Sequence, residues 1–212
     1  MGSLPNRRFK PRSRIVGEDI KTFELTKIDI AETLIRTAVR LFFQDEHPVP
    51  IYQLASSARE ILTTVGEKVG VETVLHAIAK KRNVPLKTLV GEAHKFAGRF
   101  KHANRNPTEK IQFRETDVDW VLLLACHDFG RVTGGMPVEA QVFEAWAHLV
   151  FWEEAPLRQQ RILRLAIKEF PGVRTVNRAK QKRIGLETLG RVENDPKLQM
   201  RIEREVKLAA KE

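Results

Sequence analysis

The sequence predicts an all-α protein, and three observations support that prediction. Apolar residues recur at spacings of three and four along most of the 212-residue chain, which is the period of an amphipathic helix. The ten prolines mostly fall between these periodic segments, where helices begin or end. Hydrophobic residues make up 42% and charged residues 30% of the chain, as in globular proteins. We expect a single bundle-like domain of about seven helices over residues 17–170, between a flexible basic arm (1–16) and a basic helical extension (171–212).

The first half of the chain carries four apolar stripes with helical spacing. They predict helices over residues 27–43, from Pro50 to about residue 65, over 69–82 and over 85–103. Cations end the third of these helices, where the helix dipole is negative. Over residues 20–26 the apolar spacing mixes periods of two and three, which favours a short strand or extended segment.

Three further helices are expected before residue 170. The first begins at Thr116 or Asp117 and runs to about Val132. Because its sequence is apolar nearly all round, we expect it to be the central, most buried helix. Pro137 and Pro156 each open one of the other two helices.

A proline–glycine pair at residues 171–172 predicts the end of the domain. Aromatic residues stop at Phe170, immediately before it. Residues 173–192 and 197–211 are still expected to be helical, but their apolar stripes are thin. This composition change is why the sequence predicts an extension rather than more of the core.

The positive charge lies at the two ends of the chain. The formal net charge is +10, from 37 Lys and Arg against 27 Asp and Glu. Residues 1–14 hold five basic residues and no acidic one, and residues 171–212 hold eleven basic and six acidic residues, so residues 15–170 are neutral. Basic ends are typical of proteins that bind polyanions, because each cation that neutralises a phosphate releases a counterion. The alternative interpretation is that this charge only keeps the protein soluble.

The cysteine count and the hydropathy predict a cytoplasmic protein. One cysteine cannot form an internal disulfide framework, which favours a reducing compartment. No run of 18 apolar residues occurs, so no membrane span is expected. The basic N-terminal residues are not followed by the apolar segment of a secretory signal peptide.

The first candidate nucleic-acid contacts are the cations of the basic arm. Its composition cannot bury enough apolar surface to order the arm by itself. The residues are Arg7, Arg8, Lys10, Arg12 and Arg14.

A second group of candidate contacts lies on the helix expected after residue 173. Arg174, Arg178 and Lys182 are spaced by four and share one face, with Lys180 and Arg183 beside them. No aromatic residue is available for base stacking, so contact with RNA or DNA is expected to be directed at phosphates and independent of sequence. A solvated surface helix is the alternative.

A third group lies on the expected helix 85–103, on the side opposite its apolar stripe. His94, Lys95, Gly98, Arg99, Lys101, His102 and Arg105 lie there, one above another at helical spacing. Such a face suits a phosphate, with Lys101 and Arg105 as contacts, and His102 can move a proton near neutral pH. The alternative is again a solvated basic face.

Part of the sequence resembles a family of small, uncharacterised bacterial helical proteins. The residues that carry the resemblance are 35–43, 47–49, 51–55 and, most specifically, the string Phe-Lys-His-Ala-Asn-Arg-Asn-Pro at 100–107. The resemblance covers roughly residues 27–150. It implies a helical fold and a bacterial cytosolic setting, and it implies no particular activity.

A more remote resemblance is to the HEPN class of helical ribonucleases and toxins. Their motif places an Arg four to six residues before a His on a helix at a dimer interface. Here Ala97 lies five residues before His102, and Arg99 lies only three before it. The motif is incomplete, so the resemblance implies at most a degenerate site in which Arg99 and His102 are catalytic.

The remaining polar residues predict no cofactor and no metal site. Cys126, His127 and Asp128 are adjacent in sequence, but neighbouring helical residues point in different directions, and Cys126 follows a buried apolar run. His127 and His148 could meet across two helices, but they lack the CxxC or HExxH spacing of a metal motif.

The leading functional hypothesis is a non-enzymatic protein that binds RNA or DNA through its basic ends. A HEPN-like ribonuclease or toxin using His102 is the first alternative. The second is an interaction module that forms a homo-oligomer or docks a protein through its C-terminal helices, with its charge serving only solubility.

Overall fold

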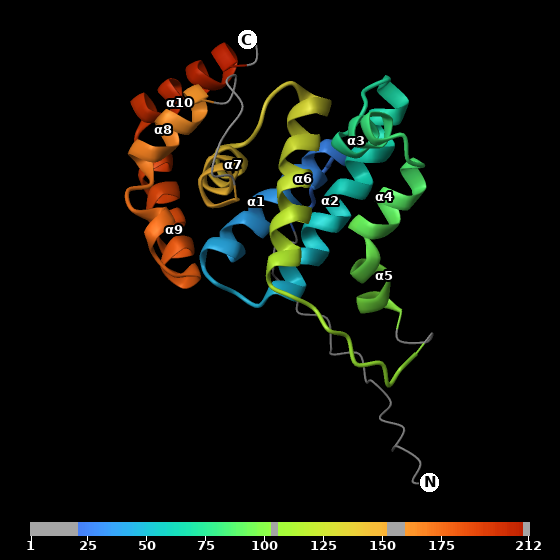
Figure 1. The fold of residues 1–212 in the computed structure, drawn as a ribbon. Coiled ribbons are helices and arrows are strands. Elements are labelled where there is room, and N and C mark those ends of the chain that lie inside the picture. Colours follow the sequence, from blue (N-terminus) through green and yellow to red (C-terminus); the bar gives the residue numbers. More distant parts are fainter. Residues whose placement is uncertain (1–20, 103–105, 152–159, 210–212) are drawn as a thin grey trace.

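The computed structural model describes residues 21–102, 106–151 and 160–209 (Figure 1). In these residues the regular structure is helical and no strand occurs, so the all-α prediction is confirmed. They form ten α-helices rather than about seven. The helices are α1 (Lys27–Phe43), α2 (Pro48–Val69), α3 (Val74–Arg82), α4 (Leu86–Ala93), α5 (Lys95–Lys101), α6 (Thr116–Thr133), α7 (Val138–Phe151), α8 (Gln160–Glu169), α9 (Arg178–Asn194) and α10 (Pro196–Ala209), with a 3-10 turn η2 (Val173–Thr175) before α9.

The first helices begin and end at residues with clear capping chemistry. Thr26 and Asp29 form a reciprocal capping box at the start of α1. Residues 21–26 are neither helix nor strand, so the extended segment expected around residues 20–26 is not a strand within the described residues. α2 begins at Pro48 rather than Pro50, because the His47 ring accepts a hydrogen bond from a backbone N–H of the first turn.

The helix expected over residues 85–103 is two helices, α4 and α5, separated at His94. The backbone there leaves helical geometry (φ −106°, ψ 10°). The Tyr52 hydroxyl donates a hydrogen bond of 2.8 Å to the Ala93 carbonyl, so a side chain of α2 binds the backbone at the end of α4. Packing of Tyr52 against Phe96 and Phe100 then fixes α5 along α2. This break is one reason why the number of helices exceeds the expected number.

The centre of the molecule is built from α1, α2, α6 and α7, with α2 and α6 side by side (Figure 1). The helix α6 has nine of its 18 residues buried, but it is not the most buried helix, because eight of the 14 residues of α7 are buried and Trp120 of α6 is 55% exposed. Beside it, an aromatic cluster joins α1 to α7, with Phe42 packed edge-on against Phe143 and Trp146.

The segment after Pro171 belongs to the same core, which corrects the prediction of a helical extension. Leu189 and Val192 of α9 are buried together with α1 and α7. Trp146 Nε1 donates a hydrogen bond of 3.0 Å to the Gln181 carbonyl. Gly185 lets α9 approach Phe43 closely, because a Cβ there would lie 2.1 Å from the ring. The thin apolar stripe of α9 is therefore sufficient to pack this helix against α1 and α7, since a hydrogen bond and the close approach at Gly185 make the rest of the contact.

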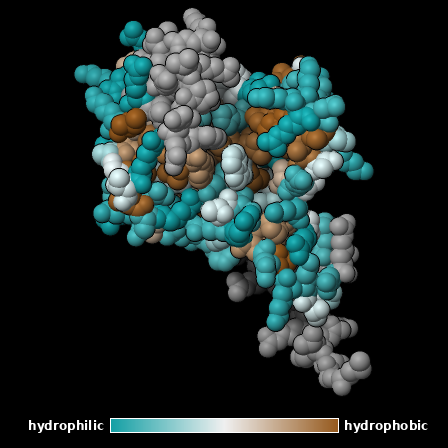
Figure 2. All heavy atoms as spheres, in the orientation of Figure 1, coloured by the Kyte–Doolittle hydropathy of each residue, from teal (hydrophilic) through white to brown (hydrophobic). Residues whose placement is uncertain are grey.

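Polar side chains dominate the face of the molecule shown in Figure 2, and apolar ones appear in separate patches. The most exposed large apolar side chains are Phe23, Met200 and Val69. In the described part of the chain, no helix has the length and apolarity needed to span a membrane.

Candidate functional site

A cleft of about 490 Å³ lies between α2 and the α4–α5 pair. His94, Gly98, Lys101 and His102 line one wall, so the structure brings together four residues of the face predicted on helix 85–103. The opposite wall is the polar face of α2, with Glu60, Thr63, Thr64 and Glu67. The cleft therefore presents charges of both signs rather than a uniformly positive surface.

Arg99, the proposed partner of His102, is engaged elsewhere. Its guanidinium donates hydrogen bonds to the Glu109 carboxylate, in the segment that follows α5. Arg99 does not line the cleft, whereas His102 does. The pairing of Arg99 with His102 in a degenerate HEPN-like site therefore has no geometric support.

His94 is held neutral at the inner end of the cleft. Burial and the positive charge of Arg59 lower its pKa to about 4. Arg59 Nη1 lies 3.2 Å from His94 Nε2, so the neutral ring accepts a hydrogen bond from the guanidinium. Arg59 is itself fully buried and forms an ion pair with Asp128 of α6. His94 thus has a structural partner and is not a surface cation.

Two cations predicted to contact nucleic acid on α9 are internal. Arg178 bonds to Glu115, the residue that precedes α6, and to Asp119 of α6, and it lies over the Phe42 ring. Lys182, whose side chain is 2% exposed, binds Glu115 and, at 2.7 Å, Asp45. The helical spacing predicted for these residues is present, but the face that they share is turned toward the bundle.

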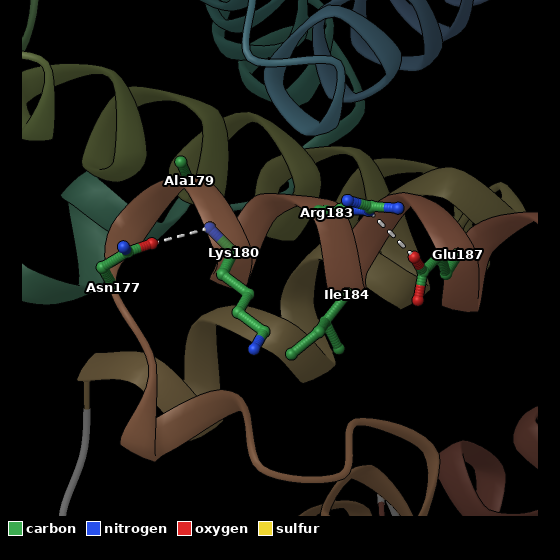
Figure 3. Close-up of a pocket in the computed structure, with 6 residues that line it drawn as sticks. All are labelled: Asn177, Ala179, Lys180, Arg183, Ile184 and Glu187. Atoms are coloured by element: carbon green, nitrogen blue, oxygen red, sulfur yellow. Dashed lines mark hydrogen bonds and ion pairs between the residues drawn. The ribbon is translucent and has the colours of Figure 1, made fainter.

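Two other cations of α9 are exposed to solvent, and Figure 3 shows them among the residues that line a pocket. Lys180 and Arg183 are exposed and line a hollow of about 440 Å³ along the helix, together with Asn177, Ile184 and Glu187. Arg183 Nε donates to Glu187 at 3.2 Å, within the same helix. Arg174, before α9, donates a hydrogen bond to the Leu149 carbonyl. The basic surface predicted around α9 is therefore smaller than expected, because Arg178 and Lys182 are held in internal ion pairs.

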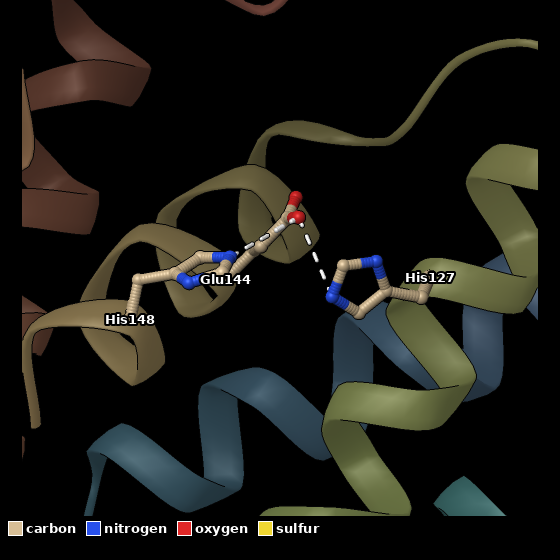
Figure 4. A group of neighbouring side chains, drawn as sticks. All are labelled: His127, Glu144 and His148. Carbon is tan, nitrogen blue, oxygen red and sulfur yellow. Dashed lines mark ion pairs between the residues drawn. The ribbon is translucent and has the colours of Figure 1, made fainter. Parts of the chain in front are cut away.

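The structure also brings together two histidines and a glutamate that the sequence did not identify as a site (Figure 4). The carboxylate of Glu144 lies between the rings of His127 on α6 and His148 on α7. Its Oε1 is 3.4 Å from His127 Nε2 and 3.7 Å from His148 Nε2. Burial raises the pKa of the Glu144 carboxyl, and the interactions with His148 and His127 lower it by more, so the pKa lies below that of an ordinary glutamate.

One signal in the sequence could have identified this cluster. Glu144 and His148 are four residues apart on one helix, so they share a face, and His127 lies on the preceding apolar helix. A search limited to HExxH and CxxC patterns does not find a set whose third member comes from another helix.

The remaining predicted contacts lie outside the described residues. These are Arg7, Arg8, Lys10, Arg12, Arg14 and Arg105.

Comparison with known proteins gives no assignment, because no protein-family model, curated protein or solved structure matches this chain. The two resemblances noted from the sequence therefore stay predictions.

Proposed function

We propose that the protein is a non-enzymatic binding protein that contacts a polyanion, RNA or DNA, through cations outside its internal ion pairs. The observation that carries the proposal is the charge balance of those pairs. The networks built around Asp119, Asp128 and Glu139, whose side chains are at most 2% exposed, use five cations and seven carboxylates, so they account for none of the net charge of +10. The cations are Arg36, Arg40, Arg59, Arg178 and Lys182; the carboxylates are Glu32, Asp45, Glu115, Asp119, Asp128, Glu139 and Glu193.

The whole positive excess therefore belongs to the rest of the chain. Part of it is the five cations of residues 1–14, and part is on the outer face of α9, where Lys180 and Arg183 are exposed. Lys101 adds a further exposed cation at the mouth of the cleft. Exposed cations pay little desolvation when they meet a phosphate, and they gain from counterion release.

The test is binding of a fluorescent single-stranded RNA, and of the same sequence as DNA, measured by anisotropy at several salt concentrations. We expect the logarithm of the affinity to fall linearly with the logarithm of salt. Lys180→Ala/Arg183→Ala and deletion of residues 1–14 should each weaken binding. If each cation contacts one phosphate of the single strand, Lys180→Ala/Arg183→Ala should reduce the slope by about 1.4.

A variant of equal charge provides the control. Lys68 and Lys110 are exposed lysines away from α9, and Lys68→Ala/Lys110→Ala removes the same charge. If this control weakens binding as much as the α9 variant, the contact is a diffuse effect of net charge and α9 is not an interface. Absence of salt-dependent binding by the full chain would reject the proposal.

A further inference from the structure

The cluster formed by His127, Glu144 and His148 has the donor set of a transition-metal site. Its three potential ligand atoms, one from each residue, lie within 4.8 Å of one another. Two imidazole nitrogens and one carboxylate oxygen are ligands that Zn²⁺ and other borderline divalent metals accept.

The two distances from Glu144 to the histidines are close to those between ligands of one ion. Strong charge-assisted hydrogen bonds are about 2.7–2.9 Å long, whereas Glu144 Oε1 lies 3.4 Å from His127 and 3.7 Å from His148. Ligands that are each about 2.1 Å from a tetrahedral ion are about 3.4 Å from one another. The two separations from Glu144 therefore suit ligands of one ion, and all three ligand atoms lie within 4.8 Å of one another.

The helices that carry the three residues are rigidly placed. On α7, Phe143, Trp146 and Ala147 are fully buried beside Glu144 and His148. On α6, Cys126 and Asp128 flank His127 and are both inaccessible to solvent. Ligands on packed helices lose little conformational entropy when they bind an ion, because the backbone is already fixed.

The electrostatics of the cluster also favour a cation. In the described part of the chain, no lysine or arginine forms an ion pair with Glu144, whose side chain is 12% exposed. The other deeply buried carboxylates, Asp119, Asp128 and Glu139, are each paired with an arginine. A carboxylate that faces two imidazoles and has no lysine or arginine partner offers its oxygen atoms to a metal ion.

We propose that His127, Glu144 and His148 bind one divalent transition-metal ion of the Zn²⁺ class. Three protein ligands leave at least one coordination position to solvent, in contrast to closed four-ligand structural sites. The opening is on the side of His127, whose side chain is 31% exposed, whereas that of His148 is 5% exposed. This site is independent of the polyanion-binding proposal, because none of its residues is a predicted nucleic-acid contact.

The experiment is a calorimetric titration of the untagged full-length chain, freed of metal by a chelator, with Zn²⁺, and an absorption titration with Co²⁺. We expect one equivalent to bind, with a Co²⁺ spectrum typical of mixed nitrogen and oxygen ligands. His127→Ala and the nearly isosteric Glu144→Gln should each weaken binding at least about 10-fold. Saturating Zn²⁺ should raise the Tm of the wild-type chain and leave the Tm of the double variant His127→Ala/Glu144→Gln unchanged.

The chain contains a matched control in the pair His76 and Glu67. Their side chains are 4.0 Å apart, also between two helices, but no third ligand accompanies them among the residues that the structure describes. His76→Ala should therefore leave binding unchanged. The proposal is overturned if no stoichiometric binding occurs, if the folded variant His127→Ala/Glu144→Gln binds like the wild type, or if His76→Ala weakens binding equally.

Discussion

Arg59 on α2 and Asp128 on α6 form an ion pair that is closed to solvent. Arg59 Nε lies 3.6 Å from Asp128 Oδ2, and the two side chains are 1% and 0% exposed. The same carboxylate accepts a hydrogen bond of 2.7 Å from the Val74 N–H, at the start of α3. The same guanidinium reaches His94 between α4 and α5. This one pair therefore connects the two central helices to both elements on one side of the bundle.

Removal of one partner of this pair should be much more damaging than removal of both. Asp128→Leu leaves the Arg59 charge buried without its counterion, which should lower the free energy of unfolding by about 3–5 kcal/mol. The double variant Arg59→Met/Asp128→Leu removes both charges and should lose clearly less than the single variant. Urea unfolding followed by circular dichroism measures both. A loss below about 1 kcal/mol in Asp128→Leu would contradict a buried pair.

The depressed pKa of His94 predicts a pH dependence of stability. In the folded protein this pKa is about 4, because of burial and the Arg59 charge, whereas an unperturbed histidine titrates near 6.5. Between these pH values the unfolded chain binds the proton more strongly than the folded one. The contribution of His94 to the free energy of unfolding is therefore fully present above about pH 6.5 and is lost as the pH falls toward 4. Because His94 is only partly buried, we expect a loss on the order of 1–2 kcal/mol after screening by solvent.

The variant His94→Gln should remove this part of the pH dependence. Glutamine retains an acceptor for Arg59 but does not titrate. The free energy of unfolding of the variant should therefore depend less steeply on pH between about 4 and 6.5 than that of the wild type. Urea unfolding at several pH values measures both slopes, and equal slopes in the two proteins would contradict the assignment.

The sequence predicts the helices that carry a regular apolar stripe, and it fails where a distant side chain decides the local structure. The helix over 27–43 matches the bounds of α1, because its stripe and capping residues are local signals. The break between α4 and α5 depends on the Tyr52 hydroxyl, which lies 41 residues before the carbonyl that it binds. Such a contact leaves no periodic trace in the sequence.

The same distinction explains how much of each candidate site could be predicted. Helical spacing correctly places Arg178 and Lys182 on one face of α9, but spacing does not show which way a face points. That face points inward because Asp119 of α6 and Glu115, immediately before α6, supply its counterions. The proposed metal-ligand set is not predicted from the sequence for a related reason, since only the packing of α6 on α7 brings His127 to Glu144 and His148.

The contact between α9 and α1 can be tested with two glycines on the same helix. A Cβ at Gly185 would lie 2.1 Å from the Phe43 ring, whereas a Cβ at Gly190 would meet no atom within 4 Å. Gly185→Ala must displace the ring or the helix, so it should lower the free energy of unfolding by about 1–3 kcal/mol. Gly190→Ala has no such clash and should raise it by about 0.5–1 kcal/mol, since alanine favours the helix.

Opposite signs for the two substitutions would show that α9 is part of the cooperative fold. Both replace a glycine by alanine in the same helix, so helix propensity is matched and the difference reports the approach to Phe43. Phe43→Leu should also relieve part of the cost of Gly185→Ala, because a smaller side chain leaves room for the Cβ. If α9 were instead a loosely attached extension, both glycine variants would be neutral or stabilising in urea unfolding, and Phe43→Leu would not change the effect at Gly185.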